Sequence, residues 1–236
     1  MLPMKVLLFG ATGMVGQGVL RECLLDPGVE GVTAVGRSPT GGSHPKLRDL
    51  VHADLFDLSP IERELAGFDA CFYCLGASSV GSTEAAYRQV TRDLTVTVAE
   101  TLVRLNRDMA FVFVSGAGSD STEHGRTMWA RVKGEAENAV LRLPFKAVCV
   151  FRPGVIIPLH GIESKTALYR IPYAMARPLL PLLERLLPDY VTTTEKIGRA
   201  MLRVAREGRP KPILETANIN GLAQPSPAPP VLPPSR

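Results

Sequence analysis

The chain of 236 residues carries 27 Lys and Arg against 23 Asp and Glu, a formal net charge of +4, and 45% of its residues are hydrophobic. That composition is typical of a folded globular protein, and it excludes a collagen, a disulfide-stapled miniprotein and a wholly disordered chain. The basic excess is local, because residues 161–211 hold ten basic and five acidic side chains, whereas residues 1–160 are almost neutral.

Short apolar runs alternate with longer helix-like segments along the chain. Some runs, such as Val6-Leu7-Leu8-Phe9, are apolar at every position, which a parallel strand covered on both faces requires. The predicted strands are residues 4–10, 29–36, 50–55, 68–76, 109–116, 145–151 and 213–216, and the predicted helices are 13–25, 60–65, 83–105, 126–143 and 195–207. This alternation predicts an α/β fold with a doubly wound parallel sheet.

Two of the predicted helices have recognisable boundaries or faces. Thr193 or Thr194 is expected to cap the helix over 195–207. Within residues 83–105, apolar side chains recur every three or four positions and predict one buried face, made of Ala86, Val90, Leu94, Val98, Leu102 and Leu105.

The first predicted strand leads into a glycine-rich turn, Gly10-Ala-Thr-Gly13-Met-Val-Gly16. Glycines at these positions permit a tight turn and let backbone N–H groups approach a pyrophosphate at the N-terminus of the next helix. The alternative is a tight turn with a structural role only. We interpret the turn as the start of a dinucleotide site, whose residues here are Gly10, Thr12, Gly13, Met14, Val15 and Gly16.

Arg37 and Ser38 follow the second predicted strand, where such a site distinguishes between its cofactors. An acidic residue there would bind the ribose 2′-hydroxyl group and repel a 2′-phosphate, whereas the planar guanidinium of arginine suits that phosphate. The sequence therefore predicts that NADP(H) is favoured over NAD(H). The alternative is that Arg37 is a surface charge stacked on the adenine.

The ends of the third and fourth predicted strands complete this site. Asp54 and Leu55 are expected to bracket the adenine. Cys74, Leu75 and Gly76 are expected to lie under the ribose and the pyrophosphate.

Cys71 and Cys74 form a C-x-x-C pattern within the fourth predicted strand. Residues three apart on a strand point to opposite faces, so we expect no metal site and no easy disulfide there. The N-terminus lacks the features of a signal peptide, and no stretch approaches the ~20 apolar residues that span a bilayer. These observations favour buried thiols in a reducing compartment, and a cytoplasmic protein.

The composition changes after residue 152. Residues 1–152 are predicted to form a dinucleotide-binding core. Residues 153–224 are expected to form a small, mostly helical substrate lobe with closing elements packed on the core. The proline-rich residues 225–236 are expected to be a disordered tail.

The motifs together resemble the short-chain dehydrogenase/reductase superfamily. In chain order they are G-A-T-G-M-V-G at 10–16, A-D-L at 53–55, C-L-G at 74–76, V-S-G at 114–116 and F-R-P-G at 151–154. Segments 74–79, 132–135 and 190–194 are similar to the atypical NAD(P)-binding epimerase/dehydratase-like proteins, which include Tat-interacting-protein-like oxidoreductases. The resemblance implies a Rossmann-type fold and a bound nicotinamide dinucleotide.

In that superfamily a Tyr-x-x-x-Lys pair on the helix after the fifth strand carries the chemistry. The resemblance assigns Lys133 to the lysine that binds the nicotinamide ribose, with a solvated helix lysine as the alternative. Four residues earlier the chain has Trp129, whose indole N–H only donates a hydrogen bond. Ser115 matches the serine that orients a substrate carbonyl, although it could equally bind cofactor only or cap the strand.

A catalytic protein without that tyrosine needs another proton relay. The candidates are His160 and Tyr169, which follow the sixth predicted strand, and Tyr87 in the helix over 83–105. We select His160 because its ordinary pKa suits the task. By analogy with the superfamily, Pro153 and Val155 would line the nicotinamide.

Two functions remain open at this point. The first is an NADPH-dependent oxidoreductase or epimerase-like enzyme for a small carbonyl or sugar-like substrate, and the second is a non-catalytic NADPH-binding regulator or scaffold. Contact of the leucine-rich segment 178–187 with a membrane surface is less favoured than packing over the cleft or at a subunit contact. No stripe of basic and aromatic residues indicates nucleic-acid binding, and an oligomer is compatible with the sequence.

Overall fold

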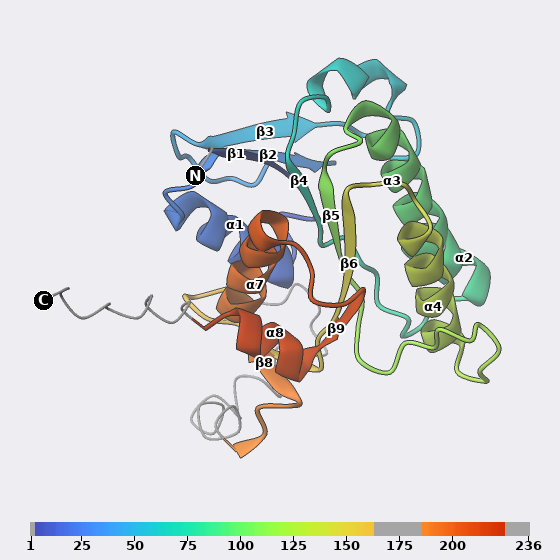
Figure 1. Cartoon of the computed structure of the whole chain (residues 1–236). Coiled ribbons are helices and arrows are strands. Elements are labelled where there is room, and N and C mark those ends of the chain that lie inside the picture. The colour runs from blue at the N-terminus through green and yellow to red at the C-terminus, as the bar shows by residue number, and fades with distance from the viewer. Residues whose placement is uncertain (1–2, 163–185, 225–236) are drawn as a thin grey trace, which may run out of the picture.

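The computed structural model describes residues 3–162 and 186–224. Within these ranges, parallel strands form one sheet in the order β3-β2-β1-β4-β5-β6-β9, and β7 and β8 form a separate parallel pair (Figure 1). The strands are β1 (Met4–Phe9), β2 (Val29–Gly36), β3 (Leu47–Val51), β4 (Ala70–Tyr73), β5 (Ala110–Val114), β6 (Ala147–Arg152), β7 (Val155–Ile157), β8 (Val191–Thr193) and β9 (Ile213–Glu215). The strand order reverses between β1 and β4, which confirms the doubly wound, Rossmann-type sheet.

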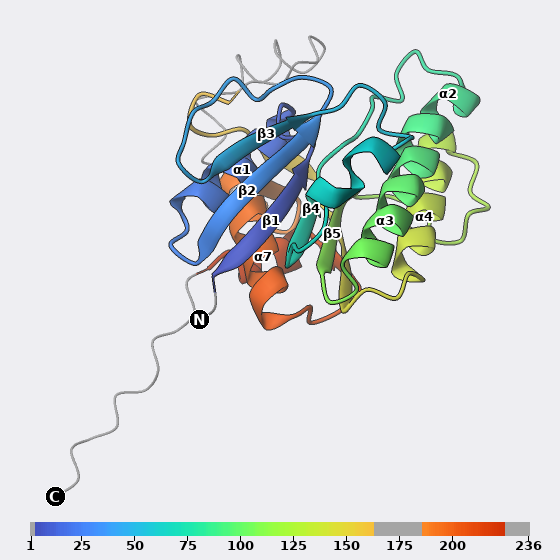
Figure 2. The ribbon, with the colours of Figure 1, turned by 90° about the horizontal axis from the view of Figure 1, so that it is seen from above.

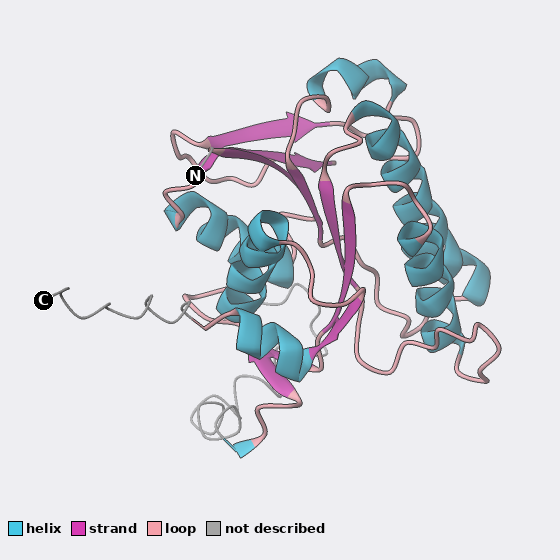
Figure 3. Ribbon diagram, viewed as in Figure 1, coloured by secondary structure: helices cyan, strands magenta, loops and turns pink. Residues whose placement is uncertain are grey.

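Helices cover both faces of this sheet (Figure 2 and Figure 3). One face carries α1 (Met14–Leu25), α7 (Thr194–Glu207) and α8 (Thr216–Leu222). The other carries α2 (Glu84–Arg88), the π-helical turn η2 (Gln89–Asp93), α3 (Leu94–Leu105) and α4 (Met128–Leu141). The predicted helix over 60–65 is a short 3-10 helix, η1 (Ser59–Glu64), between β3 and β4. The C-terminal elements are mostly helical, as predicted.

The strands are apolar at successive positions because each face of the sheet has its own hydrophobic core. Leu7 and Phe9 of β1 pack with the core beneath α3 and α4. Val6 and Leu8 of the same strand pack with the core beneath α1 and α7. Alternate residues of a strand point to opposite faces, so a strand covered on both sides must be apolar throughout.

The third strand differs from its prediction. It was expected over residues 50–55, but β3 spans Leu47–Val51. Its residues pair with β2 up to Val51 opposite Gly36, where β2 itself ends, so there is no partner for a longer strand. This edge strand has only one fully buried residue, Leu50, so its first half lacks the apolar run that marks the central strands.

The helix predicted over 83–105 is interrupted by η2. Ala86 and Val90 were expected on the buried face of this helix, but both are exposed. Tyr87 and Thr91, one position further along, are buried instead. A π-helical turn contains more residues than an α-helical turn, so it rotates the preceding residues relative to α3. From Leu94 onward the predicted face packs inward as expected.

The C-terminal elements return to the same sheet. Thr193 caps α7, with its hydroxyl oxygen accepting a hydrogen bond from the Lys196 N–H at 3.0 Å. The short last strand predicted over residues 213–216 is β9, which pairs with β6 and forms one edge of the sheet. The proline-rich tail, residues 225–236, lies outside the described residues. Among the helices within the described ranges, none is both long enough and apolar enough to cross a bilayer.

The basic side chains of α7 form ion pairs with acidic residues of the same layer. Arg199 binds Glu22 of α1 at 3.2 Å, and Arg206 forms a two-pronged ion pair with Asp26 at the end of α1. Arg203 pairs with Glu207 one turn further along α7. The part of the basic excess that lies on α7 therefore contributes to packing of α7 on α1.

Candidate functional site

In the glycine-rich turn between β1 and α1, close backbone contacts leave no room for a side chain at Gly10 or at Gly16. Gly10 has a φ of +82°, a conformation that L side chains rarely adopt. A Cβ atom there would lie 2.7 Å from the carbonyl carbon of Cys74. A Cβ atom on Gly16 would fall within 3.0 Å of the Gly10 carbonyl oxygen, which also accepts a hydrogen bond from the Gly13 N–H at 2.9 Å. The turn thus brings the start of α1 against the ends of β1 and β4.

The N-terminus of α1 has no side-chain cap. Gly13 enters the helix in an extended conformation, and the first turn contains no acidic residue. The N–H groups at the start of a helix have no acceptor within the helix and carry its partial positive charge. Here they belong to Met14, Val15 and Gly16. The Thr12 carbonyl, in the turn itself, accepts a hydrogen bond from the Gln17 side chain at 3.2 Å.

Arg37 and Ser38 lie beside this turn. Phe9 pairs with Val35 across β1 and β2, so the chain leaves β2 next to Gly10. Both Arg37 and Ser38 are exposed, and Arg37 forms no ion pair with any other residue in ranges 3–162 and 186–224. The guanidinium is therefore available to a ligand bound at the turn.

Asp54 and Leu55 follow β3 in a loop instead of ending the strand. Asp54 is exposed, and its carboxylate accepts a hydrogen bond from the Phe56 N–H at 2.9 Å. Leu55 is buried in the core beneath α3. Asp54 thus presents a side chain to solvent after β3, whereas the Leu55 side chain fills the core. Their predicted contact with an adenine stays a prediction.

Cys74, Leu75 and Gly76 follow β4 directly beneath the glycine turn. The Cys74 N–H donates to the Phe9 carbonyl at 2.9 Å, and the Leu75 nitrogen is one of the atoms that a Cβ on Gly10 would meet. Cys71 lies in the core beneath α3, whereas Cys74 packs against the core on the other face. The two sulfurs therefore point to opposite faces, as predicted, and burial raises the pKa of both thiols.

Ser115 directly follows β5, and its side chain is turned into its own loop. Its hydroxyl group is buried and lies 3.1 Å from the hydroxyl of Ser119, which in turn donates to the Gly116 carbonyl at 2.7 Å. Ala117, which follows Gly116 in this loop, donates its N–H to the Pro153 carbonyl at 2.9 Å. The loop after β5 and the residue after β6 therefore lie side by side at the carboxyl end of the sheet.

Lys133 and Trp129 of α4 both face the loop after β5. A Cβ atom on Gly116 would lie 3.8 Å from Cε of Lys133, and one on Gly118 would lie 3.3 Å from the Trp129 ring. This agrees with the expectation that residues four apart share one face of a helix. Burial lowers the pKa of the Lys133 ammonium group, and the Glu137 carboxylate opposes that change. Among the described residues, Lys133 has no ion-pair partner.

His160 lies after β7 and contacts α7. Its φ is +58°, and its ring Nε2 lies 2.7 Å from the Glu195 carboxylate. The adjacent Leu159 N–H donates to the Thr194 hydroxyl at 3.2 Å. In the part of the chain that is described, these contacts do not extend to Ser115 or Lys133, so the role of His160 as a relay stays a prediction.

The remaining predicted residues differ in exposure. Val155 of β7 is half exposed, and its N–H donates to the Tyr190 carbonyl at 2.9 Å. Tyr87 is buried in α2, which raises the pKa of its hydroxyl group. Tyr169 and residues 178–185 of the leucine-rich segment lie outside the described residues. Within the described ranges, no group of three or more His, Cys, Asp or Glu side chains is placed to hold a metal ion.

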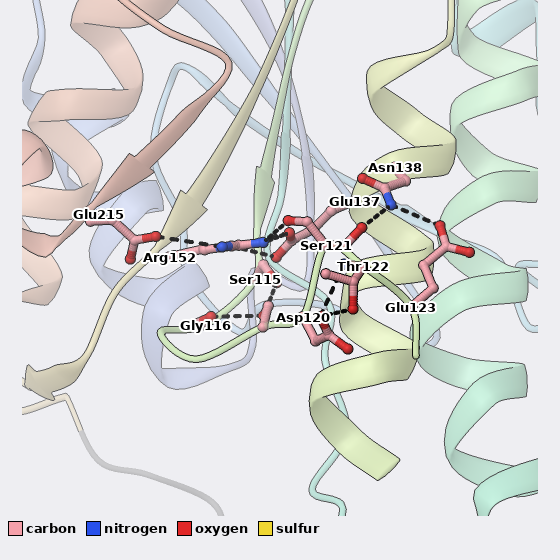
Figure 4. Close-up of polar contacts among 11 residues, drawn as sticks. Ser115, Gly116, Asp120, Ser121, Thr122, Glu123, Glu137, Asn138, Arg152 and Glu215 are labelled. Carbon is pink, nitrogen blue, oxygen red and sulfur yellow. Dashed lines mark hydrogen bonds and ion pairs between the residues drawn. The ribbon is translucent and has the colours of Figure 1, made fainter. Parts of the chain in front are cut away.

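A buried ion pair close to this site was not identified from the sequence. Arg152, at the end of β6, binds Glu137 of α4 through Nε at 3.1 Å and also through Nη2 (Figure 4). In the sequence, no local pattern distinguishes either residue from an ordinary surface charge. The only available indication was the position of Glu137, one helical turn after Lys133 on the same helix.

Comparison with known proteins gives one family match and many similar structures. Residues 6–126 match the NAD dependent epimerase/dehydratase family. The rat protein HTATIP2 is 28% identical over 156 residues, which cover 65% of this chain and 63% of the rat protein, so the match spans less than two thirds of that relative. The protein FMP52, mitochondrial, of Chaetomium globosum is 25% identical over 166 residues, covering 68% of this chain and 70% of the fungal protein.

Two solved structures illustrate the similarity of fold. The Bordetella bronchiseptica enzyme WbmF, in complex with NAD+, aligns with a TM-score of 0.63 and 17% identity over 94% of this chain and 77% of WbmF. MoeE5, in complex with UDP-glucose and NAD, aligns with a TM-score of 0.63 and 20% identity over 89% of this chain and 74% of MoeE5. At these identities the likeness shows the fold alone.

Proposed function

The chain belongs to the NAD dependent epimerase/dehydratase family, and from this premise we propose that it is an NADPH-dependent oxidoreductase or epimerase-like enzyme acting on a small carbonyl or sugar-like substrate. The observation that carries the proposal is the uncapped N-terminus of α1, packed by Gly10 and Gly16 against the ends of β1 and β4. Free N–H groups at a helix N-terminus, preceded by a glycine-rich turn that lets a ligand approach the backbone, bind a pyrophosphate. The residues present therefore fit a dinucleotide.

Each part of the dinucleotide has a group of residues placed to hold it. The pyrophosphate would bind the N–H groups of Met14, Val15 and Gly16, and the adenosine 2′-phosphate would bind Arg37 beside the turn. Lys133, which faces Gly116 with no ion-pair partner in the described ranges, would donate hydrogen bonds to the nicotinamide ribose. A reduced nicotinamide dinucleotide supplies a hydride when bound.

The preference for NADPH is tested by Arg37→Asp. Loss of a charge-assisted contact with the 2′-phosphate is expected to weaken NADPH binding about 10- to 100-fold and to leave NADH binding nearly unchanged. Fluorescence titration of the full chain with each cofactor measures both affinities. Arg107→Asp is the matched control, because Arg107 is exposed and precedes β5, at the amino ends of the parallel strands, whereas Arg37 follows the carboxyl end of β2. Equal affinity of the wild type for both cofactors, or no loss in Arg37→Asp, would refute the preference.

A non-catalytic NADPH-binding regulator is the second candidate, and the position of Trp129 favours it. The Trp129 ring packs against Gly118, in the place where the superfamily carries its proton-donating tyrosine. An indole has no accessible proton-transfer pKa, so this position moves no proton.

Trp129→Tyr tests which candidate holds. A phenol four residues before Lys133 restores a group that can move a proton, and a general acid contributes about 10²- to 10⁴-fold to such reactions. Turnover of a panel of carbonyl substrates with NADPH is expected to rise by at least about 100-fold over the wild type. Trp129→Phe, which lacks the hydroxyl, is the control and is expected to show no rise. No turnover in any of the three proteins would favour the regulator.

His160→Ala completes that experiment. The His160 ring is bound to Glu195, so a relay through it requires that this contact breaks in the working protein. In our proposal, His160→Ala abolishes wild-type turnover and leaves NADPH affinity unchanged. Retained turnover would remove His160 as the relay without affecting the proposed cofactor site.

A further inference from the structure

Arg152 joins three separate elements at the carboxyl end of β6. Its Nε and Nη2 atoms bind both carboxylate oxygens of Glu137 on α4. Nη2 also donates to the Ser121 hydroxyl at 2.6 Å, in the loop that follows β5. Nη1 lies 3.5 Å from the carboxylate of Glu215, at the end of β9 (Figure 4). One guanidinium group therefore fixes α4 and this loop to the sheet.

This ion pair is almost completely shielded from solvent. Glu137 is 0% exposed and the Arg152 side chain 11% exposed. Burying two charges has a large desolvation cost, and apolar residues of similar size are often equally stabilising. An apolar pair of similar size could therefore fill the same space without that cost.

The surface of α4 that includes Glu137 also carries Lys133. Lys133 lies one turn before Glu137 and faces Gly116. Between them, Gly134 touches the loop so closely that a Cβ atom there would fall within 3.0 Å of the Asp120 carbonyl oxygen. The Asp120 N–H donates to the Ala130 carbonyl of α4 at 2.9 Å. The position of α4 against this loop thus sets where the Lys133 ammonium group lies.

We propose that Glu137 and Arg152 are positioning residues, which hold α4 against the loop after β5 so that Lys133 lies where it binds the dinucleotide. The inference rests on the proposed dinucleotide site. Arg152 fixes the Glu137 carboxylate on both oxygens, and this carboxylate, one turn along α4 from Lys133, favours the charged form of the Lys133 amine. Neither residue touches the dinucleotide in this arrangement.

Other charged groups packed around α4 do not replace Glu137 in this role. Arg88 of α2 pairs with Glu84 of the same helix and with Glu135 of α4, and Arg131 of α4 pairs with Glu84. The other charged residues on elements with many contacts to α4 are Arg92 and Asp93 of η2, Glu100 and Arg104 of α3 and Arg152 of β6. Of these, Arg92 pairs with Asp93, and Arg104 with Glu62. In the loop after β5, the Asp120 carboxylate accepts hydrogen bonds from the N–H groups of Thr122 and Gly125, and the Glu123 carboxylate accepts one from Asn138. Besides burial, the charge that acts on Lys133 is Glu137.

The first measurement needs no cofactor. Lysine side chains of the full chain are labelled by reductive ¹³C-methylation, and the Lys133 signal is assigned by its loss in Lys133→Arg. Burial already lowers the Lys133 pKa in the wild type, and we expect a still lower Lys133 pKa in Glu137→Gln. The reason is that the variant lacks the carboxylate that favours the charged amine. An unchanged Lys133 pKa in a folded Glu137→Gln protein would overturn the proposal.

The second measurement is NADPH affinity in a series of variants, each with its melting temperature. Glu137→Gln is expected to weaken NADPH binding about tenfold. The double variant Glu137→Leu/Arg152→Met replaces the ion pair with apolar side chains and is expected to regain the wild-type melting temperature, but not the affinity. A merely structural role predicts instead that affinity and melting temperature recover together, and that result would overturn the proposal even if Glu137→Gln fails to fold.

The two measurements separate this inference from the proposed function. If the wild type does not bind NADPH, the proposed function fails, and the Lys133 titration still decides whether Glu137 holds the amine charged. If the wild type binds NADPH and Glu137→Gln binds it equally well, the positioning role fails and the proposed function stands.

Discussion

Gly16→Ala is expected to remove measurable NADPH binding. The added Cβ atom would fall within 3.0 Å of the Gly10 carbonyl oxygen, so the turn must open or α1 must move away from β1. Either change misplaces the N–H groups that the proposal assigns to the pyrophosphate. We expect NADPH affinity to fall by more than about 100-fold, and the free energy of unfolding to fall by about 1–3 kcal/mol, as for other overpacked sites.

A matched control separates this effect from a general effect of alanine in a helix. Gly221 lies in α8 with no atom within 4 Å of a Cβ placed on it. Gly221→Ala should leave NADPH affinity unchanged and keep or raise stability, since alanine favours a helix over glycine by about 1 kcal/mol. A Gly16→Ala protein that is folded and binds NADPH with wild-type affinity would contradict the assignment of this turn.

Gly134→Ala is expected to have the largest effect on stability. Alanine normally stabilises a helix interior, but the added Cβ atom would fall within 3.0 Å of the Asp120 carbonyl oxygen. Asp120 cannot yield easily, because its side chain accepts hydrogen bonds from the N–H groups of Thr122 at 2.9 Å and Gly125 at 2.7 Å. We expect the free energy of unfolding to fall by about 2–4 kcal/mol, at the upper end for overpacking.

Urea unfolding of Gly134→Ala against the wild type and Gly221→Ala measures this change. If α4 moves away from the loop instead of unfolding, Lys133 moves with it, and NADPH affinity falls while stability is nearly kept. Wild-type stability together with wild-type affinity would show that the loop after β5 does not constrain α4.

The central strands could be predicted because burial of both faces of a strand requires an uninterrupted run of apolar residues in the sequence. Val6 to Phe9 is apolar throughout, since alternate residues enter different cores. The glycine turn was predictable for a related reason, because contacts such as that of Gly10 with Cys74 exclude every other residue. The shared face of Trp129 and Lys133 followed from helical periodicity alone.

Other features depend on tertiary contacts that leave no local pattern. The end of β3 is set by the end of its partner β2, and the exposure of Val90 by a π-helical turn that periodicity does not reveal. Arg152 and Glu137 are separated by 15 residues, and a charge in a sequence is normally interpreted as a surface residue. Only the fold shows that these two charges are buried and paired.

Titration of the full chain with NADPH and with NADH, followed by cofactor fluorescence, tests the central claim most directly. We expect saturable binding of NADPH, at least about tenfold tighter than that of NADH, with the difference lost in Arg37→Asp. Absence of saturable binding of either cofactor would contradict the claim that the glycine turn, Arg37 and Lys133 form a dinucleotide site.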